Sequence, residues 1–232
     1  MLSSETRPAG MVALRVYPMP TPLLVIPARE LSLREILYFG FPHTALSQEV
    51  RRWRRNNIVY LWRGLKRVGI ARLLGLPHFY GQLSLAMISP PGERVDYGLA
   101  SLRVVTTAGV NFIIDALQGL TTLSNLRYHG LGQGGAQETV DNTTLSSELT
   151  TQYNPDNTRA TGTLTEGTAA NIFKTVGIIT LDATATIVEH GIFSQAAAPG
   201  GTLLDRSTFT AQTVIAGFSV EATYLFTVNA GG

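Results

Sequence analysis

The first regular pattern of hydrophobic positions in the chain predicts a helix over residues 44 to 76. Apolar residues recur every three or four positions from Leu46 to Val68, which is the spacing of one face of an α-helix. A glycine and a proline follow the last turn, as expected where a helix ends. Asn56 and Asn57 interrupt the apolar spacing, so the pattern also allows a break in the helix at this point.

From Gly81 onward the apolar positions alternate with a period of two, which predicts β-strands. The cluster Pro90-Pro91-Gly92-Glu93 lies between two such runs and predicts the turn of a β-hairpin. A helix is expected over residues 107 to 118, with Thr106 or Thr107 as its N-cap and Gly119 just past its end. The expected strands cover residues 82 to 88, 94 to 105, 124 to 131, 158 to 166, 170 to 182, 185 to 193, 201 to 210 and 218 to 228.

These elements predict a mainly β fold, an antiparallel β-sandwich of jelly-roll-like type with one packed helix. No helix lies between successive strands, which argues against a doubly wound parallel sheet. Six prolines among residues 1 to 43 remove backbone donors and hold their neighbours extended. The expected organisation is therefore an extended Pro-rich arm at 1–43, a basic amphipathic helix at 44–76 and a β-sandwich domain at 81–232.

The composition favours the same class of fold. Only 15% of the 232 residues are charged, against roughly 25% in an average soluble domain. The chain has 23 glycines and no cysteine. Disulfides, zinc sites with thiolate ligands and cysteine nucleophiles are thereby excluded, and the fold must be held by packing and hydrogen bonds.

Charge divides the chain into two unequal parts. Residues 1 to 80 carry 12 Lys and Arg and 4 Asp and Glu, a formal charge of +8, whereas residues 81 to 232 carry −6. Such an asymmetry indicates that the front segment meets an anionic partner, or the acidic surface of another copy or another protein. A solvated helix face is the alternative interpretation.

No export signal or membrane-spanning segment is expected. Four prolines between positions 18 and 27 interrupt the early apolar run, whereas a signal peptide needs an unbroken one. Residues 58 to 76 are apolar but include four cationic side chains, which are costly inside a bilayer.

Gly130, Gly132, Gly134 and Gly135 superficially resemble a dinucleotide-binding loop. Such a loop works only where it opens a helix, and the polar stretch that follows has no helical period. We expect instead that these glycines give the backbone access to positive φ in a loop.

Histidines and carboxylates supply only weak candidates for a catalytic or metal site. His129, Glu189 and His190 are the plausible cluster, but adjacent residues on a strand point to opposite faces, so Glu189 and His190 cannot hold one ion together. The carboxylate pairs Asp182 with Glu189 and Asp205 with Glu221 are of the kind that chance supplies. No nucleophile elbow, phosphate-binding loop or zinc-protease motif occurs. We therefore expect no enzyme, no cofactor and no metal.

The basic helix carries the main concentration of charged and aromatic side chains, and we predict that it binds a partner. Arg and Trp are enriched as anchors of protein interfaces and also suit nucleic-acid backbones, although nucleic acid is the weaker alternative. The alternative interpretation is that the two tryptophans belong to the buried stripe of the helix. The candidate partner-binding residues are Arg51, Arg52, Trp53, Arg54, Arg55, Tyr60, Trp62, Lys66 and Arg67.

Several short stretches between residues 81 and 232 resemble those of tailed-bacteriophage virion proteins. The stretches are Tyr97-Gly98, Arg103 to Val110, Tyr128-His129-Gly130-Leu131-Gly132, Arg159-Ala160-Thr161-Gly162-Thr163, Val188-Glu189-His190-Gly191-Ile192-Phe193 and Gly201-Thr202-Leu203-Leu204-Asp205-Arg206-Ser207. The acidic-His-Gly stretch and the Leu-Leu-Asp-Arg stretch are also similar to elements of phage tail fibre and baseplate proteins. These stretches consist of strand and turn residues and carry no catalytic signature.

The resemblance implies an all-β structural module of the virion. A head decoration or cement protein is the first expectation, and a tail fibre, baseplate or tail-attachment protein is the second. The implied partners are the major capsid protein or other virion subunits and further copies of the same chain, with a trimer as one stoichiometry by family analogy.

Two other classes of function remain open. A carbohydrate-binding module would need Tyr97, Tyr128, Tyr153 and Tyr224 on one exposed face, and an enzyme would need a convergent polar pocket.

Overall fold

The computed structural model describes residues 48–103 and 105–230, without the side chains of Arg67 and Arg72. The predicted arm at 1–43 and the first residues of the predicted helix, 44–47, lie outside the described residues. Val104, inside the predicted strand 94–105, does so too.

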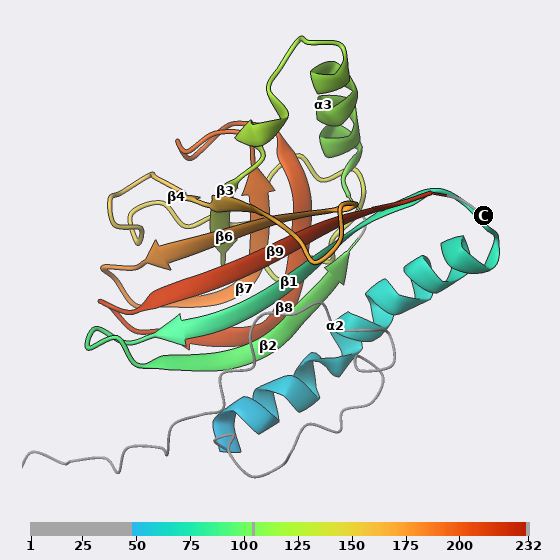
Figure 1. Cartoon of the computed structure of the whole chain (residues 1–232). Coiled ribbons are helices and arrows are strands. Elements are labelled where there is room, and N and C mark those ends of the chain that lie inside the picture. Colours follow the sequence, from blue (N-terminus) through green and yellow to red (C-terminus); the bar gives the residue numbers. More distant parts are fainter. Residues whose placement is uncertain (1–47, 104, 231–232) are drawn as a thin grey trace, which may run out of the picture.

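Two antiparallel sheets pack face to face, with strand orders β2-β1-β9-β6-β5 and β4-β3-β7-β8 (Figure 1). Successive pairs of strands alternate between the sheets, and β9 returns to the first sheet, between β1 and β6. The mainly β, antiparallel sandwich expected from the alternating pattern is confirmed. The strands are β1 His78–Ile88, β2 Arg94–Arg103, β3 Tyr128–Gly132, β4 Ala160–Thr161, β5 Thr163–Glu166, β6 Ile172–Thr180, β7 Ala185–Phe193, β8 Leu203–Val214 and β9 Ser219–Asn229.

The predicted strand 158–166 is split between the two sheets. β4 pairs with β3 in one sheet, β5 pairs with β6 in the other, and Gly162 lies between them. A Cβ at Gly162 would run into the hydroxyl of Thr175 and lie 2.7 Å from His129 Nε2. The chain can therefore cross tightly from one sheet to the other only because residue 162 has no side chain.

The predicted hairpin turn and the predicted helix are both present. Gly92 has a φ of +92° in the turn between β1 and β2, where Ser89 N–H donates to Glu93 O at 2.9 Å. Helix α3 covers Thr107–Leu117, and the hydroxyl of its N-cap Thr106 accepts from Gly109 N–H at 2.9 Å. Residues 124–127, expected to begin the next strand, are not in a strand, and the 3-10 helix η1, Leu123–Asn125, overlaps the first two of them.

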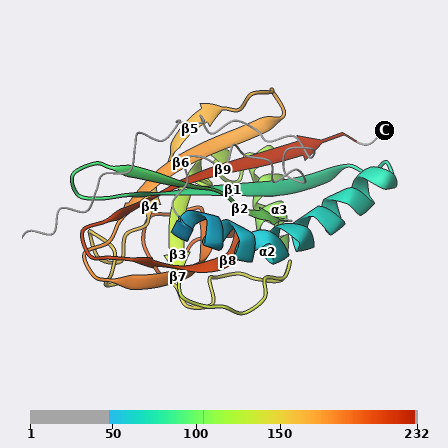
Figure 2. The same ribbon diagram turned by 90° about the horizontal axis from the view of Figure 1, so that it is seen from below.

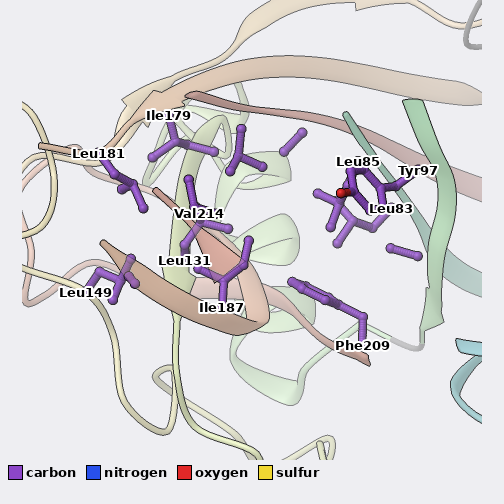
Figure 3. Packing of buried hydrophobic residues seen from close by; sticks show 14 of the residues in the cluster. Leu83, Leu85, Tyr97, Leu131, Leu149, Ile179, Leu181, Ile187, Phe209 and Val214 are labelled. Carbon is purple, nitrogen blue, oxygen red and sulfur yellow. The ribbon is translucent and has the colours of Figure 1, made fainter. Parts of the chain in front are cut away.

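The main core lies between the sheets (Figure 3). Leu83, Leu85 and Tyr97 from the first sheet face Leu131 and Phe209 from the second, and all five are at most 5% exposed. Aliphatic and aromatic side chains from distant parts of the sequence therefore supply the apolar burial that stabilises the sandwich.

Helix α2, Gln48–Leu73, lies along the side of the sandwich where β2 and β8 are the outermost strands (Figure 2). The helix continues without interruption through Asn56 and Asn57, so the break that the sequence allowed does not occur. It ends as expected: Gly75 has a φ of +63°, and Leu76 N–H donates to Ala71 O at 3.0 Å.

Candidate protein-interaction surface

The inner face of α2 is part of the core of the β-sandwich. Val50 and Trp53 are 1% and 4% exposed and belong to the same cluster as Tyr97 and Phe209. The indole of Trp53 meets the ring of Tyr97 edge-on, with ring centroids 5.3 Å apart. Nearer the C-terminus of α2, Leu61 packs with Leu102 of β2. The helix and the sheets therefore share one hydrophobic interior.

Polar side chains of α2 also satisfy the free backbone groups of the two edge strands. Asn57 Nδ2 donates to Ala100 O of β2 at 2.5 Å, and its Oδ1 accepts from Thr210 N–H of β8 at 2.9 Å. Trp53 Nε1 donates to Thr210 O at 2.8 Å. Unpaired backbone groups at a sheet edge are ready to pair with another chain. Helix α2 thus closes this side of the sandwich, and Asn57 joins both edges.

Two further contacts fix the helix against β2. Arg54 donates from Nε to Tyr97 O at 2.8 Å and from Nη2 to Asp96 O at 3.0 Å. Gly64 lies so close to the strand that a Cβ there would collide with the Leu102 backbone. Any larger residue at position 64 would push the helix away from β2.

The outer face of α2 combines cationic and apolar side chains. Arg52, Arg55 and Lys66 are exposed, and Lys66 Nζ lies 5.8 Å from the ring centroid of Trp62. Trp62 is 52% exposed. We call this set the outer face of α2. Its exposed members are Arg51, Arg52, Arg55, Ile58, Val59, Trp62, Arg63, Lys66, Ile70 and Leu73.

The structure divides the nine residues predicted to bind a partner. Arg51, Arg52, Arg55, Trp62 and Lys66 are exposed on the outer face of α2, and Tyr60 is half-buried. Trp53 is bonded to β8 and Arg54 to β2 of the same chain. Trp53 therefore belongs to the buried stripe of the helix, which was the alternative interpretation. The side chain of Arg67 lies outside the described residues.

The separation of the two tryptophans could have been read from the sequence. Trp53 and Trp62 are nine residues apart, which is two and a half turns of an α-helix, so they point to opposite sides. The edge-binding role of Asn57 carries no comparable local signal, because its partners are 43 and 153 positions away.

The histidine pair is buried between the sheets. His129 Nδ1 lies 3.0 Å from His190 Nε2, and His129 Nε2 lies 3.1 Å from the Thr175 hydroxyl. Burial lowers the pKa of His129 to about 3, and burial together with His129 lowers the pKa of His190. Both rings are neutral near pH 7 and act as hydrogen-bonding parts of the core.

Glu189 points to the other face of β7, as adjacent positions on a strand require. Its carboxylate pairs with Arg206 Nε at 2.7 Å and accepts from three loop N–H groups, those of Gly134, Ser146 and Ser147, at 2.8 to 3.0 Å. Arg206 in turn donates to Ala136 O at 3.0 Å. This buried pair holds the loop of residues 133–148 onto the second sheet.

The expected role of the four clustered glycines is wrong. None of Gly130, Gly132, Gly134 and Gly135 has a positive φ. Instead, a Cβ at Gly132 would lie 2.6 Å from Ser147 O, and one at Gly134 would lie 2.7 Å from Glu189 Oε1. Three of these glycines allow the loop to approach buried charged groups closely, whereas Gly135 has open space around it.

Two more ion pairs are used inside the fold. Arg159, bonded to Glu148 at 2.5 Å, also donates from Nη1 to the carbonyls of Gln195, Ala197 and Gly200. Arg103 pairs with Glu138 at 2.7 Å and donates to Thr208 O of β8. These buried charges hold loops and an edge strand in place.

The carboxylate pairs considered from the sequence have different surroundings. Asp182 is exposed in a turn whereas Glu189 is buried, and Asp205 is buried whereas Glu221 pairs with Arg94 at 2.8 Å. Among the described residues, no group of three or more His, Asp or Glu side chains is placed to hold a metal ion.

The tyrosines required for a carbohydrate platform do not share an exposed face. Tyr97, Tyr153 and Tyr224 are at most 5% exposed, and only Tyr128 is partly accessible. The hydroxyl of Tyr153 is bonded to both backbone groups of Leu131, at 2.7 and 2.9 Å.

No protein-family model matches this chain, and no curated protein matches it. Within the described part, no helix is long and apolar enough to cross a membrane.

Proposed function

We propose that this chain is a non-enzymatic structural protein of a tailed-phage particle, a head decoration or cement protein that binds other virion subunits, first the major capsid protein. The observation that carries the proposal is the difference between the two faces of α2. Its inner face closes the sandwich, and its outer face presents exposed cations, such as Arg52 and Arg55, together with the half-exposed Trp62. Exposed aromatic and arginine side chains on a rigid element are typical anchors of protein interfaces.

The stretches that resemble phage virion proteins meet in the interior of the fold. His129 contacts His190, Glu189 pairs with Arg206, and a Cβ at Gly130 would lie 3.4 Å from Arg159 Nε. All five side chains and Gly130 belong to the resembling stretches. The resemblance therefore supports the proposal through the construction of the β body, and the binding surface is argued from α2 alone.

Interior polar groups favour a structural role over catalysis. The carboxylates of Glu138, Glu148 and Glu189 each bind an arginine, and the histidine pair is fully buried. Groups used in this way stabilise loops and are not available to a substrate.

The test is incorporation of the full-length chain into particles made without the wild-type copy. We expect the protein on the head in an image of the particle, and we expect Trp62→Ala to weaken its binding about 30-fold, since an interface anchor contributes about 2 kcal/mol or more. The matched control is Ile178→Ala on β6, a similarly exposed apolar residue outside α2. Both variants should melt at the wild-type temperature.

Absence of the chain from purified particles would refute the proposal. Its presence on the tail would replace the decoration role by a fibre or tail-attachment role. Normal incorporation of Trp62→Ala would show that another surface makes the contact.

A further inference from the structure

One end of the sandwich is predominantly acidic. The turns β1–β2, β6–β7 and β8–β9 meet there, since Leu181 N–H donates to Phe218 O at 3.0 Å and a Cβ at Gly217 would lie 3.6 Å from Pro90. The loop before β4 joins them, because Asn154 N–H donates to Thr180 O at 3.0 Å. We call these four segments, residues 86–93, 150–158, 180–186 and 214–220, the acidic turn end.

The acidic turn end has three exposed carboxylates and no cation. Glu93, Asp156 and Asp182 are exposed, and the four segments contain no Lys, Arg or His. The next cation along β2, Arg94, is already shared by Glu221 and Asp96, at 2.8 and 3.6 Å. The negative charge of this end is therefore not neutralised by its own described surroundings.

The outer face of α2 has the opposite charge. Its exposed members, as defined above, include five Lys and Arg and no Asp or Glu. Arg52 and Arg55 are exposed on the half of the helix nearer its N-terminus. Two α2 faces brought together would repel each other, so this surface does not suit a symmetric contact with its own copy.

Resting on the proposed function, we infer that the acidic turn end of a second copy is the partner of this half of the α2 face. The two surfaces lie on different sides of the molecule, with α2 facing the viewer and the turns at the left in Figure 2. One copy can therefore offer α2 to the turn end of the next while its own turn end stays available. Such a head-to-tail contact closes into a ring or continues as a filament.

The other half of the outer face, which combines Trp62, Ile70 and Leu73 with Arg63 and Lys66, stays available for a different subunit. The contact between copies depends on charge, so it should weaken as salt screens it. The contact proposed for the virion partner depends on Trp62, so the two can be tested with separate variants.

The experiment measures the mass of the purified full-length protein in solution at about 50 mM and about 1 M salt. We expect association at low salt that is lost at high salt. Arg52→Glu with Arg55→Glu should give a monomer at both, and so should Glu93→Lys with Asp182→Lys. A charge-matched control, Asp115→Lys with Glu166→Lys, changes exposed carboxylates outside the acidic turn end and should associate like the wild type.

Mixing the two monomeric variants gives the sharpest result. In the α2-reversed copy, residues 48–61 change from a net charge of +3 to −1 and the turn end stays acidic. In the turn-reversed copy, the turn end becomes net basic and α2 stays basic. An equimolar mixture should therefore associate at low salt, because each reversed surface meets a surface of opposite charge. A symmetric α2–α2 or turn–turn contact would bring like charges together in the wild type, so it would not predict that the wild type associates. Circular dichroism and melting temperature confirm that each variant is folded.

A wild-type protein that is monomeric at both salt concentrations would overturn the inference, as would variants that associate like the wild type or a mixture that stays monomeric. If the chain is monomeric but still binds particles through Trp62, only this inference fails. If it associates as described but is absent from particles, only the proposed function fails.

Discussion

Asp205 shows how a single buried group makes the stability of this fold depend on pH. Its carboxyl lies between the sheets, accepts from the Ser207 hydroxyl at 3.1 Å and faces Gly81, where a Cβ would lie 2.6 Å from both Asp205 Oδ2 and the Tyr224 hydroxyl. Burial raises the pKa of Asp205 to about 7, although Ser207, Arg103 and Tyr224 act against the shift. The folded protein therefore binds a proton at a pH where the unfolded chain has released it.

This shift predicts the behaviour of Asp205→Asn. Between pH 4 and pH 7 the folded wild type holds more protons than the unfolded chain, so its free energy of unfolding falls as the pH rises. The asparagine variant lacks this loss, so its stability relative to the wild type should increase by about 3 kcal/mol over that range. Urea unfolding at several pH values measures the difference. Parallel pH profiles of stability for the two proteins would contradict the raised pKa of Asp205.

At the scale of elements, α2 is the part whose role changes most between sequence and structure. Its charge pattern reads as a separate basic segment, yet its inner face contributes Val50 and Trp53 to the core and covers two strand edges. The β-sandwich of residues 81–232 is therefore not closed without the helix. A chain that begins at Gly81, which we would expect from the sequence to fold alone, would also lose the first three residues of β1.

Asn57→Ala tests whether α2 holds the two edges together. The substitution leaves Ala100 O and Thr210 N–H without the bonds that Asn57 provides. An unsatisfied buried group costs about 1 to 3 kcal/mol, so we expect a loss of about 2 to 4 kcal/mol in the free energy of unfolding. The neighbouring Asn56 is exposed, and Asn56→Ala should change it by less than about 0.5 kcal/mol. Equal effects of the two variants would refute the role of Asn57.

At the scale of the whole molecule, the helix and both sheets should unfold together. Val50 and Trp53 of α2 belong to the same core cluster as residues of both sheets, such as Leu83 and Phe209. A shared interior of this kind makes separate melting of the helix unfavourable.

The prediction can be measured with Trp62→Phe, which leaves Trp53 as the sole tryptophan, since the chain has two. Emission from the buried Trp53 and the circular dichroism of the strands should then change at the same urea concentration. A Trp53 transition at clearly lower urea would mean that α2 detaches before the sheets unfold.

Local features of the fold were determined by the sequence itself. The alternating positions predicted the strands, the turn cluster at 90–93 predicted the hairpin, and Thr106 and Gly119 marked the ends of α3. These features depend on backbone preferences and side-chain spacing within a few residues, so they can be read from neighbouring positions. The basic character of α2, which supplies the candidate surface, is equally local.

The tertiary structure alone decided which side of α2 is buried and what the polar interior does. Asn57 binds strands far along the chain, and Gly132 and Gly134 make room for a loop over Glu189. Strand β1 pairs along its length with β9, the last strand in the sequence. Each depends on groups brought together from distant positions, and the pattern around one residue carries no information about a partner more than a hundred positions away. The sequence therefore predicted the class of fold and a charged helix. The packing of that helix on two strand edges determined which of its residues remain exposed.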